Sequence, residues 1–190
     1  MSAEPVAGGV DGAAGGIDWI FASGSLIWRP GFDSPERRAA LLPGFARRFW
    51  QASHDHRGTP DAPGRVVTLV PDAGASCAGV AWRIPSASRG ALLDVLDVRE
   101  RDGYERVGVD VLLDGRTPAR AVTWIASAGN PSWVGDAPED ELAALIATRR
   151  GPSGANADYL FDLADALRAL GVVDDHVHGL ERRVRALLGG

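Results

Sequence analysis

The alternation of hydrophobic and polar positions predicts β-strands in the first two thirds of the chain. Short apolar or alternating runs, several bounded by Gly, Pro or Asp, are typical of strands that bury one or both faces. These runs span residues 18–22, 45–53, 66–70, 77–84, 104–112 and 121–126. Pro43-Gly44 is expected to open the second strand, and Asp114-Gly115 predicts a hairpin turn between the last two.

Helical spacing dominates the rest of the chain. Ser88 is expected to cap a helix whose apolar positions include Leu92, Leu93, Leu96 and Val98. A C-terminal helical segment covers residues 136–188. Its three helices are expected to begin at Asp136, at Asn156 and at Asp174 or Asp175, and Gly171 closes the second. Strands followed by helices predict an α+β fold, a small mixed β-barrel of about six strands with helices packed outside.

Two stretches stand apart from this pattern. Residues 1–16 are rich in Gly and Ala and show no period, so we expect a flexible tail and a single domain over residues 17–190. Residues 54–64 form a long polar connection between two strands. Loops of this length inside a compact domain are usually functional or disordered.

Composition narrows the class of protein. The 190 residues carry a formal net charge of −5, which argues against a nucleic-acid partner because phosphate binding needs a basic face. No apolar run approaches the ~20 residues of a membrane span, and the N-terminus lacks the pattern of a secretion signal. The single cysteine, Cys77, excludes an internal disulfide framework. We therefore expect a cytoplasmic protein.

The densest group of charges lies at residues 96–106, where a predicted helix ends just before a predicted strand. Glu100 sits at its centre between Arg99 and Arg101. An element boundary can direct a side chain into a cleft while rigid neighbours fix its orientation. The alternative is a solvated helix end with salt-bridged charges. Spacing alone does not separate the two.

Other candidate chemistries are weaker. His54 and His56 could contribute two metal ligands, but no third ligand stands at a recognisable spacing. Ser25 is not in a nucleophile-elbow motif, and no particular His is marked as its base. Gly24-Ser25 follows an apolar run directly, an arrangement that can present backbone N–H groups to an anion or oxyanion. An ordinary turn explains the same residues.

Two-carboxylate glycosidase chemistry would need a second acid beside Glu100, and Asp97 and Asp102 are only its neighbours in sequence. Tryptophans could line a sugar cleft, but four of the six lie in strand-like runs where core packing is the simpler account: Trp19, Trp50, Trp82 and Trp124.

Several short blocks occur in an order that resembles the ChaC family of γ-glutamylcyclotransferases. They are Trp19-Ile20-Phe21, Gly24-Ser25-Leu26-Ile27-Trp28, Arg48-Phe49-Trp50-Gln51, Asp55-His56-Arg57-Gly58-Thr59-Pro60, Pro63-Gly64-Arg65-Val66-Val67-Thr68-Leu69, Leu96-Asp97-Val98-Arg99-Glu100, Gly103-Tyr104, Gly151-Pro152-Ser153-Gly154 and Tyr159-Leu160-Phe161. The resemblance extends from Trp19 to the last helix.

The resemblance implies a γ-glutamylcyclotransferase-like fold and cleavage of glutathione, a small-molecule substrate, into 5-oxoproline and cysteinylglycine. The family's catalytic glutamate corresponds to Glu100. Its Gly/Ser turn, which holds the γ-glutamyl group, corresponds to Ala22, Ser23, Gly24, Ser25, Leu26 and Ile27. Tyr159 matches a family tyrosine expected at the pocket. Such a reaction implies no metal, no organic cofactor and no obligate protein partner.

The chemistry constrains the surroundings of Glu100. A free Glu, with a pKa near ~4.3, is a poor base for an ammonium group, so burial has to raise the pKa of Glu100. We therefore predict that Arg99 and Arg101 point away from its carboxylate. Arg57 and Arg65 are candidates to pair with substrate carboxylates, and structural ion pairing is the alternative.

One position departs from the family pattern. The family's turn reads Tyr-Gly-Ser-Leu, and this chain has Ser23 in place of the tyrosine. A roomier pocket favours slower turnover of glutathione or a different γ-glutamyl substrate. Two alternatives to glutathione cleavage therefore stay open: the same chemistry on another γ-glutamyl amine or peptide, and a non-catalytic protein that binds γ-glutamyl ligands.

Overall fold

The computed structural model describes residues 16–100 and 102–189. Except for Gly16, the predicted N-terminal tail lies outside these residues. The elements follow in the order β1 (Trp19–Ala22), η1 (Ser25–Ile27), β2 (Arg37–Ser53), β3 (Gly64–Arg83), η2 (Ser86–Ser88), α1 (Arg89–Arg99), β4 (Tyr104–Leu113), β5 (Thr117–Ala126), α2 (Glu139–Thr148), β6 (Arg150–Gly151), β7 (Gly154–Ala155), α3 (Asn156–Ala169) and α4 (Asp175–Gly189).

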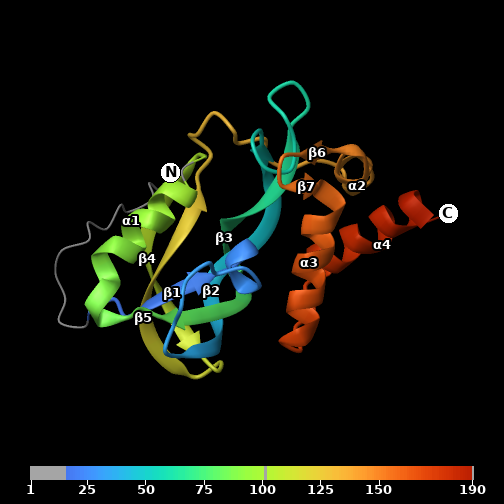
Figure 1. The fold of residues 1–190 in the computed structure, drawn as a ribbon. Helices are drawn as coiled ribbons and strands as arrows, with labels where there is room; N and C mark the ends of the chain where they lie inside the picture. The colour runs from blue at the N-terminus through green and yellow to red at the C-terminus, as the bar shows by residue number, and fades with distance from the viewer. Residues whose placement is uncertain (1–15, 101, 190) are drawn as a thin grey trace, which may run out of the picture.

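Five strands close into a barrel in the order β1-β3-β2-β4-β5, and parallel pairing between β1 and β5 completes the ring. Figure 1 shows α1 on one side of the barrel and α2, α3 and α4 together on the other. The predicted α+β barrel with outer helices is confirmed. Its strand number is one below the expected six, because residues 66–70 and 77–84 belong to the single strand β3.

The two longest strands are irregular where the sequence suggested breaks. Pro43-Gly44 lies inside β2 and does not open it. The register between β2 and β3 shifts there, because Pro43 pairs with Ser76 while Phe45 pairs with Pro71. Gly44 has φ 79°, a conformation that glycine adopts without strain. Turn-forming residues thus produce a bulge within one strand.

Two clusters of buried side chains hold the fold together. One cluster is centred on Phe21, Leu42, Leu69 and Val111 of the barrel strands. The larger cluster joins the opposite face of β1 to the helices and includes fully buried positions on α2, α3 and α4: Ile146, Leu160, Leu163, Leu167, Leu180 and Val184. Within the described residues, no helix is long and apolar enough to cross a membrane.

Some of the predicted helix caps agree with the structure and others do not. Asp174 caps α4 by accepting a hydrogen bond from Val177 N at 3.1 Å, and Gly171 follows α3 with φ 70°, both as expected. The cap predicted at Asp136 is wrong, since α2 begins three residues later, after Pro138. Asn156 is the first residue of α3 and not its cap, because its side chain bonds the backbone of Arg65. Ser88 precedes α1 but makes no capping hydrogen bond.

Candidate functional site

A cavity of about 280 Å³ opens between the end of β1, the end of α1, the start of β4 and the helix α3. Its walls come from segments far apart in sequence. The lining residues are Phe21, Ala22, Ser23, Gly24, Ser25, Leu26, Trp28, Arg29, Ser53, Asp55, His56, Arg57, Val66, Val67, Arg99, Glu100, Asp102, Tyr104, Thr123, Trp124, Ser153 and Tyr159.

The turn after β1 forms one wall. Gly24 precedes the short 3-10 helix η1, whose turn closes through Ile27 N donating to Gly24 O at 2.9 Å. Within the described part of the chain, the amides of Gly24, Ser25 and Leu26 have no hydrogen-bond acceptor. A Cβ atom at Gly24 would lie 3.1 Å from the Tyr159 hydroxyl. Glycine at this position therefore lets the backbone approach that hydroxyl closely.

Glu100 also lines the cavity. It is the C-terminal cap of α1, where its N–H donates to Leu96 O at 2.9 Å. Leu96 is buried and anchors the last turn of the helix. The Glu100 side chain is 20 % exposed, and burial raises the pKa of its carboxyl above the ordinary value. Arg99 and His56 lower that pKa by their charge, but burial outweighs them.

The prediction that Arg99 points away from Glu100 is wrong. Arg99 Nε lies 3.5 Å from Glu100 Oε1. The rest of the Arg99 guanidinium donates to Pro30 O at 2.8 Å and to Arg29 O at 2.9 Å. The guanidinium thus ties α1 to the segment after η1, and only its edge meets the carboxylate. Arg101, the other arginine in that prediction, lies outside the described residues.

Two tyrosines meet at one residue of β3. The Tyr104 hydroxyl donates to Val67 O at 2.6 Å, and the Tyr159 hydroxyl accepts from Val67 N at 3.5 Å. Burial raises the pKa of Tyr104 well above its ordinary value and also raises that of Tyr159. Both hydroxyls therefore stay protonated near neutral pH. Tyr159 has no acceptor for its own proton among the described residues.

Arg57 lies at the cavity, and Arg65 lies away from it. Arg57 lines the cavity, stacks over the Tyr159 ring at 5.6 Å and donates to Ala155 O at 3.1 Å. Burial lowers the pKa of Arg57, but an arginine remains charged at neutral pH. Arg65 does not line the cavity. Its backbone N–H and C=O bond the side chain of Asn156, so it anchors the start of α3.

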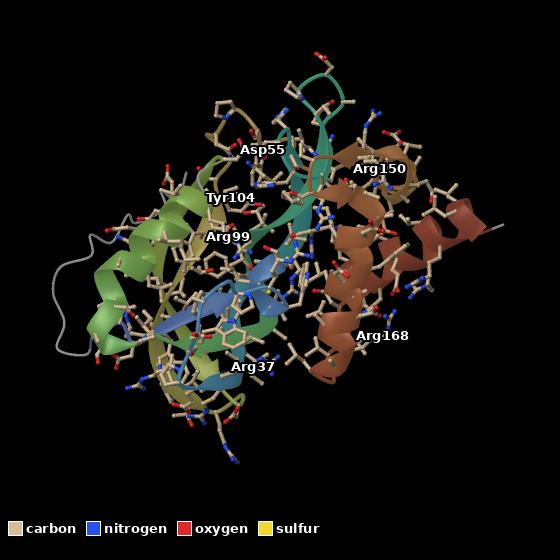
Figure 2. The ribbon with its side chains drawn as sticks, viewed as in Figure 1. Arg37, Asp55, Arg99, Tyr104, Arg150 and Arg168 are labelled. Carbon is tan, nitrogen blue, oxygen red and sulfur yellow. The ribbon has the colours of Figure 1, made fainter. Side chains whose placement is uncertain are left out.

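Six of the seven residues predicted to bind substrate line the cavity: Ala22, Ser23, Gly24, Ser25, Leu26 and Tyr159. Ile27 does not; it is 4 % exposed and belongs to the larger buried cluster. Sequence reasoning gave no site role to Arg99, Tyr104 or Trp124. Figure 2 shows Arg99 and Tyr104 on the same side of the molecule, with Asp55 above them in this view, and all three line the cavity. Tyr104 begins a strand of alternating residues, so the sequence pattern did not indicate a role for its hydroxyl in the site.

The structure also places the tryptophan and histidine candidates. Trp19 is 4 % exposed in the barrel core, whereas Trp124 lines the cavity and donates to Asp97 Oδ1 at 2.9 Å. His56 reaches the cavity and lies 2.9 Å from Ser153 Oγ. Among the described residues, no group of three or more His, Cys, Asp or Glu side chains is placed to hold a metal ion.

Comparison with known proteins adds to this geometry. Residues 18–187 match the family model described as ChaC-like protein. The chain is 42 % identical to gamma-glutamylcyclotransferase 2-3 of Arabidopsis thaliana, with 90 % of this chain and 89 % of that protein covered. It is 37 % identical to human glutathione-specific gamma-glutamylcyclotransferase 1, over 90 % of this chain and 79 % of that protein.

A solved structure gives the same picture. The glutathione-specific γ-glutamyl cyclotransferase from yeast superposes with a TM-score of 0.84 at 30 % identity, covering 89 % of this chain and 96 % of that one. At this level of identity and coverage, the two proteins share the same fold.

Proposed function

The chain belongs to the ChaC-like protein family, and we propose that it is a γ-glutamylcyclotransferase that cleaves glutathione into 5-oxoproline and cysteinylglycine. The observation that carries the proposal is the placement of Glu100. A carboxyl group with a raised pKa lines the same cavity as a glycine turn whose amides have no acceptor among the described residues. A proton acceptor and hydrogen-bond donors that line one cavity suit an acyl transfer.

In the proposed reaction, the α-amino nitrogen of the substrate attacks its own γ-carbonyl carbon. A C–N bond forms the five-membered lactam, the C–N bond to the cysteinyl residue breaks, and no water is consumed. Glu100 takes a proton from the substrate ammonium, which frees the amine to attack. That nitrogen gives up a second proton as the lactam forms, and the departing nitrogen gains two and leaves as the cysteinyl ammonium, with Glu100 as the proton relay. Because nucleophile and carbonyl belong to one molecule, the cavity mainly has to enforce the cyclising conformer. Each step moves a proton or exchanges an acyl bond, so no redox cofactor is called for.

The turn is proposed to stabilise the developing oxyanion. Gly24 and Ser25 line the cavity, and their amides have no acceptor within residues 16–100 and 102–189. One well-placed donor typically contributes on the order of 3 kcal/mol to such a transition state. Tyr159, whose hydroxyl keeps its proton for a ligand, is proposed to bond the substrate as well.

Arg57 is the proposed partner of a substrate carboxylate. It lines the cavity, while Arg65 lies elsewhere. The only side-chain hydrogen bond that Arg57 makes within the described residues leaves from Nη1, so its other donors remain for a ligand. A guanidinium suits two-point binding of a carboxylate. Substitution by Met is expected to raise KM for glutathione roughly tenfold.

Ser23 supports a second candidate substrate. It lines the cavity where the family pattern has an aromatic ring. A larger γ-glutamyl amine or peptide would be accommodated there, with the chemistry unchanged. A cytoplasmic location, and function without a nucleic-acid or obligate protein partner, remain predictions.

The test is to incubate purified protein with glutathione and follow 5-oxoproline and cysteinylglycine by mass spectrometry. Glu100→Gln is expected to lower kcat at least about 100-fold without loss of the fold, because the amide cannot accept the proton. Glu105→Gln is the matched control, since that exposed side chain lies outside the cavity. Full activity in Glu100→Gln would exclude the proton-transfer role.

A further inference from the structure

Arg47 on β2 is buried beneath the substrate turn. Its side chain has 0 % exposure, and it does not line the cavity. Arg47 Nε donates to Ser23 O at 2.6 Å, and Nη1 donates to Asp174 Oδ2 at 2.6 Å. Nη2 donates to Ala78 O. One guanidinium therefore connects the turn, the strand β3 and the cap of α4.

The guanidinium lies where the pairing of β1 with β3 ends. Ala22 and Val80 are the last partners in that ladder. Beyond them the chain of β1 turns toward η1, and the carbonyls of Ser23 and Ala78 accept from Arg47. A Cβ atom at Gly79 would lie 2.2 Å from Ala22 O, so the two strands touch closely just before this point. Arg47 thus bonds the chain at the point where it leaves the barrel.

Burying a guanidinium is costly unless its donors are satisfied. The Asp174 carboxylate, which is 17 % exposed, provides the opposite charge and also caps α4. An apolar side chain could fill the same space, but it could not direct the Ser23 carbonyl. Compared with an apolar side chain, the guanidinium adds control over the direction of the Ser23 carbonyl.

The orientation of this carbonyl fixes that of the next amide. The Ser23–Gly24 peptide is planar and trans, so its C=O and N–H point in opposite directions. Arg47 holds the carbonyl toward the interior, and the Gly24 N–H therefore faces the cavity side of the turn. We propose that Arg47 is a positioning residue that aims the Gly24 amide at the reacting carbonyl oxygen. This inference rests on the proposed function.

The double substitution Arg47→Met with Asp174→Asn tests it. Met fills the volume, and Asn keeps a cap for α4 without leaving a lone buried charge. We expect kcat for glutathione to fall about 100-fold, as for loss of one oxyanion donor, with KM changed less than about threefold. Should that variant fail to fold, Arg47→Lys replaces it. It keeps the charge but cannot span both carbonyls, and the same fall in kcat is expected.

Leu180→Ala is the control for stability. Leu180 is fully buried on α4, away from the cavity, so its truncation should lower Tm with little change in kcat. If this variant loses kcat in proportion to its loss of Tm, as the Arg47 variant does, the effect of Arg47 is only structural and the inference fails.

The backbone amide of Gly24 gives a second readout, independent of activity. In ¹⁵N-labelled protein without ligand, the Gly24 resonance is expected to move in the Arg47 variant and to stay in place in Leu180→Ala. An unchanged Gly24 resonance in the Arg47 variant would overturn the positioning role. If the resonance moves but the unmodified protein releases no 5-oxoproline from glutathione, the proposed function is overturned instead.

Discussion

Arg99 Nε lies 3.5 Å from Glu100 Oε1, yet the pKa of Glu100 is raised, because burial outweighs the nearby charge. Arg99→Met should raise this pKa further, since it removes a cation that favours the carboxylate. Glu100 must be ionised to act as a base, so the acidic limb of kcat/KM against pH is expected to move to higher pH.

Arg89→Met serves as the control for that pH profile. Arg89 stands at the opposite end of α1, bonded to Asp18, and its loss removes the same charge from the helix. Its profile should coincide with that of the unmodified protein. A shift of equal size in both variants would mean that net charge, and not the contact with Glu100, sets the pH of the acidic limb.

The raised pKa of Glu100 also makes stability depend on pH. Between the unfolded and folded pKa values, the folded protein binds more protons, so this carboxyl lowers stability as pH rises through that window. Glu100→Gln lacks the ionisable group. Its Tm should therefore exceed that of the unmodified protein at pH 8, with a smaller difference at pH 5. Thermal unfolding at both values measures this, and a difference independent of pH would contradict it.

The two tyrosines at Val67 should respond differently to loss of the hydroxyl. Tyr104→Phe removes a 2.6 Å hydrogen bond to a buried carbonyl and should lower the free energy of unfolding by about 1–2 kcal/mol. Tyr159→Phe removes only a 3.5 Å contact, so about 0.5 kcal/mol is expected. Urea denaturation compares them.

Kinetics should show the reverse order. Because the Tyr159 hydroxyl has a proton to offer a ligand, Tyr159→Phe is expected to raise KM for glutathione roughly tenfold, the equivalent of one hydrogen bond. If Tyr104→Phe raised KM more than Tyr159→Phe, the assignment of the substrate-bonding hydroxyl would be reversed.

Ser23→Tyr tests the departure from the family turn. The new ring would occupy part of the 280 Å³ cavity and add apolar contact to a bound γ-glutamyl group. We expect kcat/KM for glutathione to rise about threefold to tenfold relative to larger γ-glutamyl compounds. Ser23→Ala is the control, with little expected change. Identical substrate rankings in all three proteins would show that this position does not set specificity.

Sequence patterns alone located most of the helices and strands and most residues of the site. Period-two alternation located β4, and the Asp114-Gly115 turn predicted that residues 121–126, which belong to β5, pair back with it as a hairpin. The ordered motifs pointed to Glu100, the turn after β1 and Tyr159, all of which line one cavity. Local patterns succeed here because strand alternation and glycine turns depend on neighbours in the chain.

The contacts between those segments became visible only in the folded protein. Asn156 has the residue type of a helix cap, but it bonds Arg65, ninety-one positions away in sequence. Arg99 contacts Glu100 because the carbonyls of Pro30 and Arg29 hold its guanidinium beside the carboxylate. Arg47 reads as one polar residue in a strand, and folding buries it under Ser23. Such contacts join distant segments, and burial, which sets the pKa of Glu100, exists only once those segments have packed together.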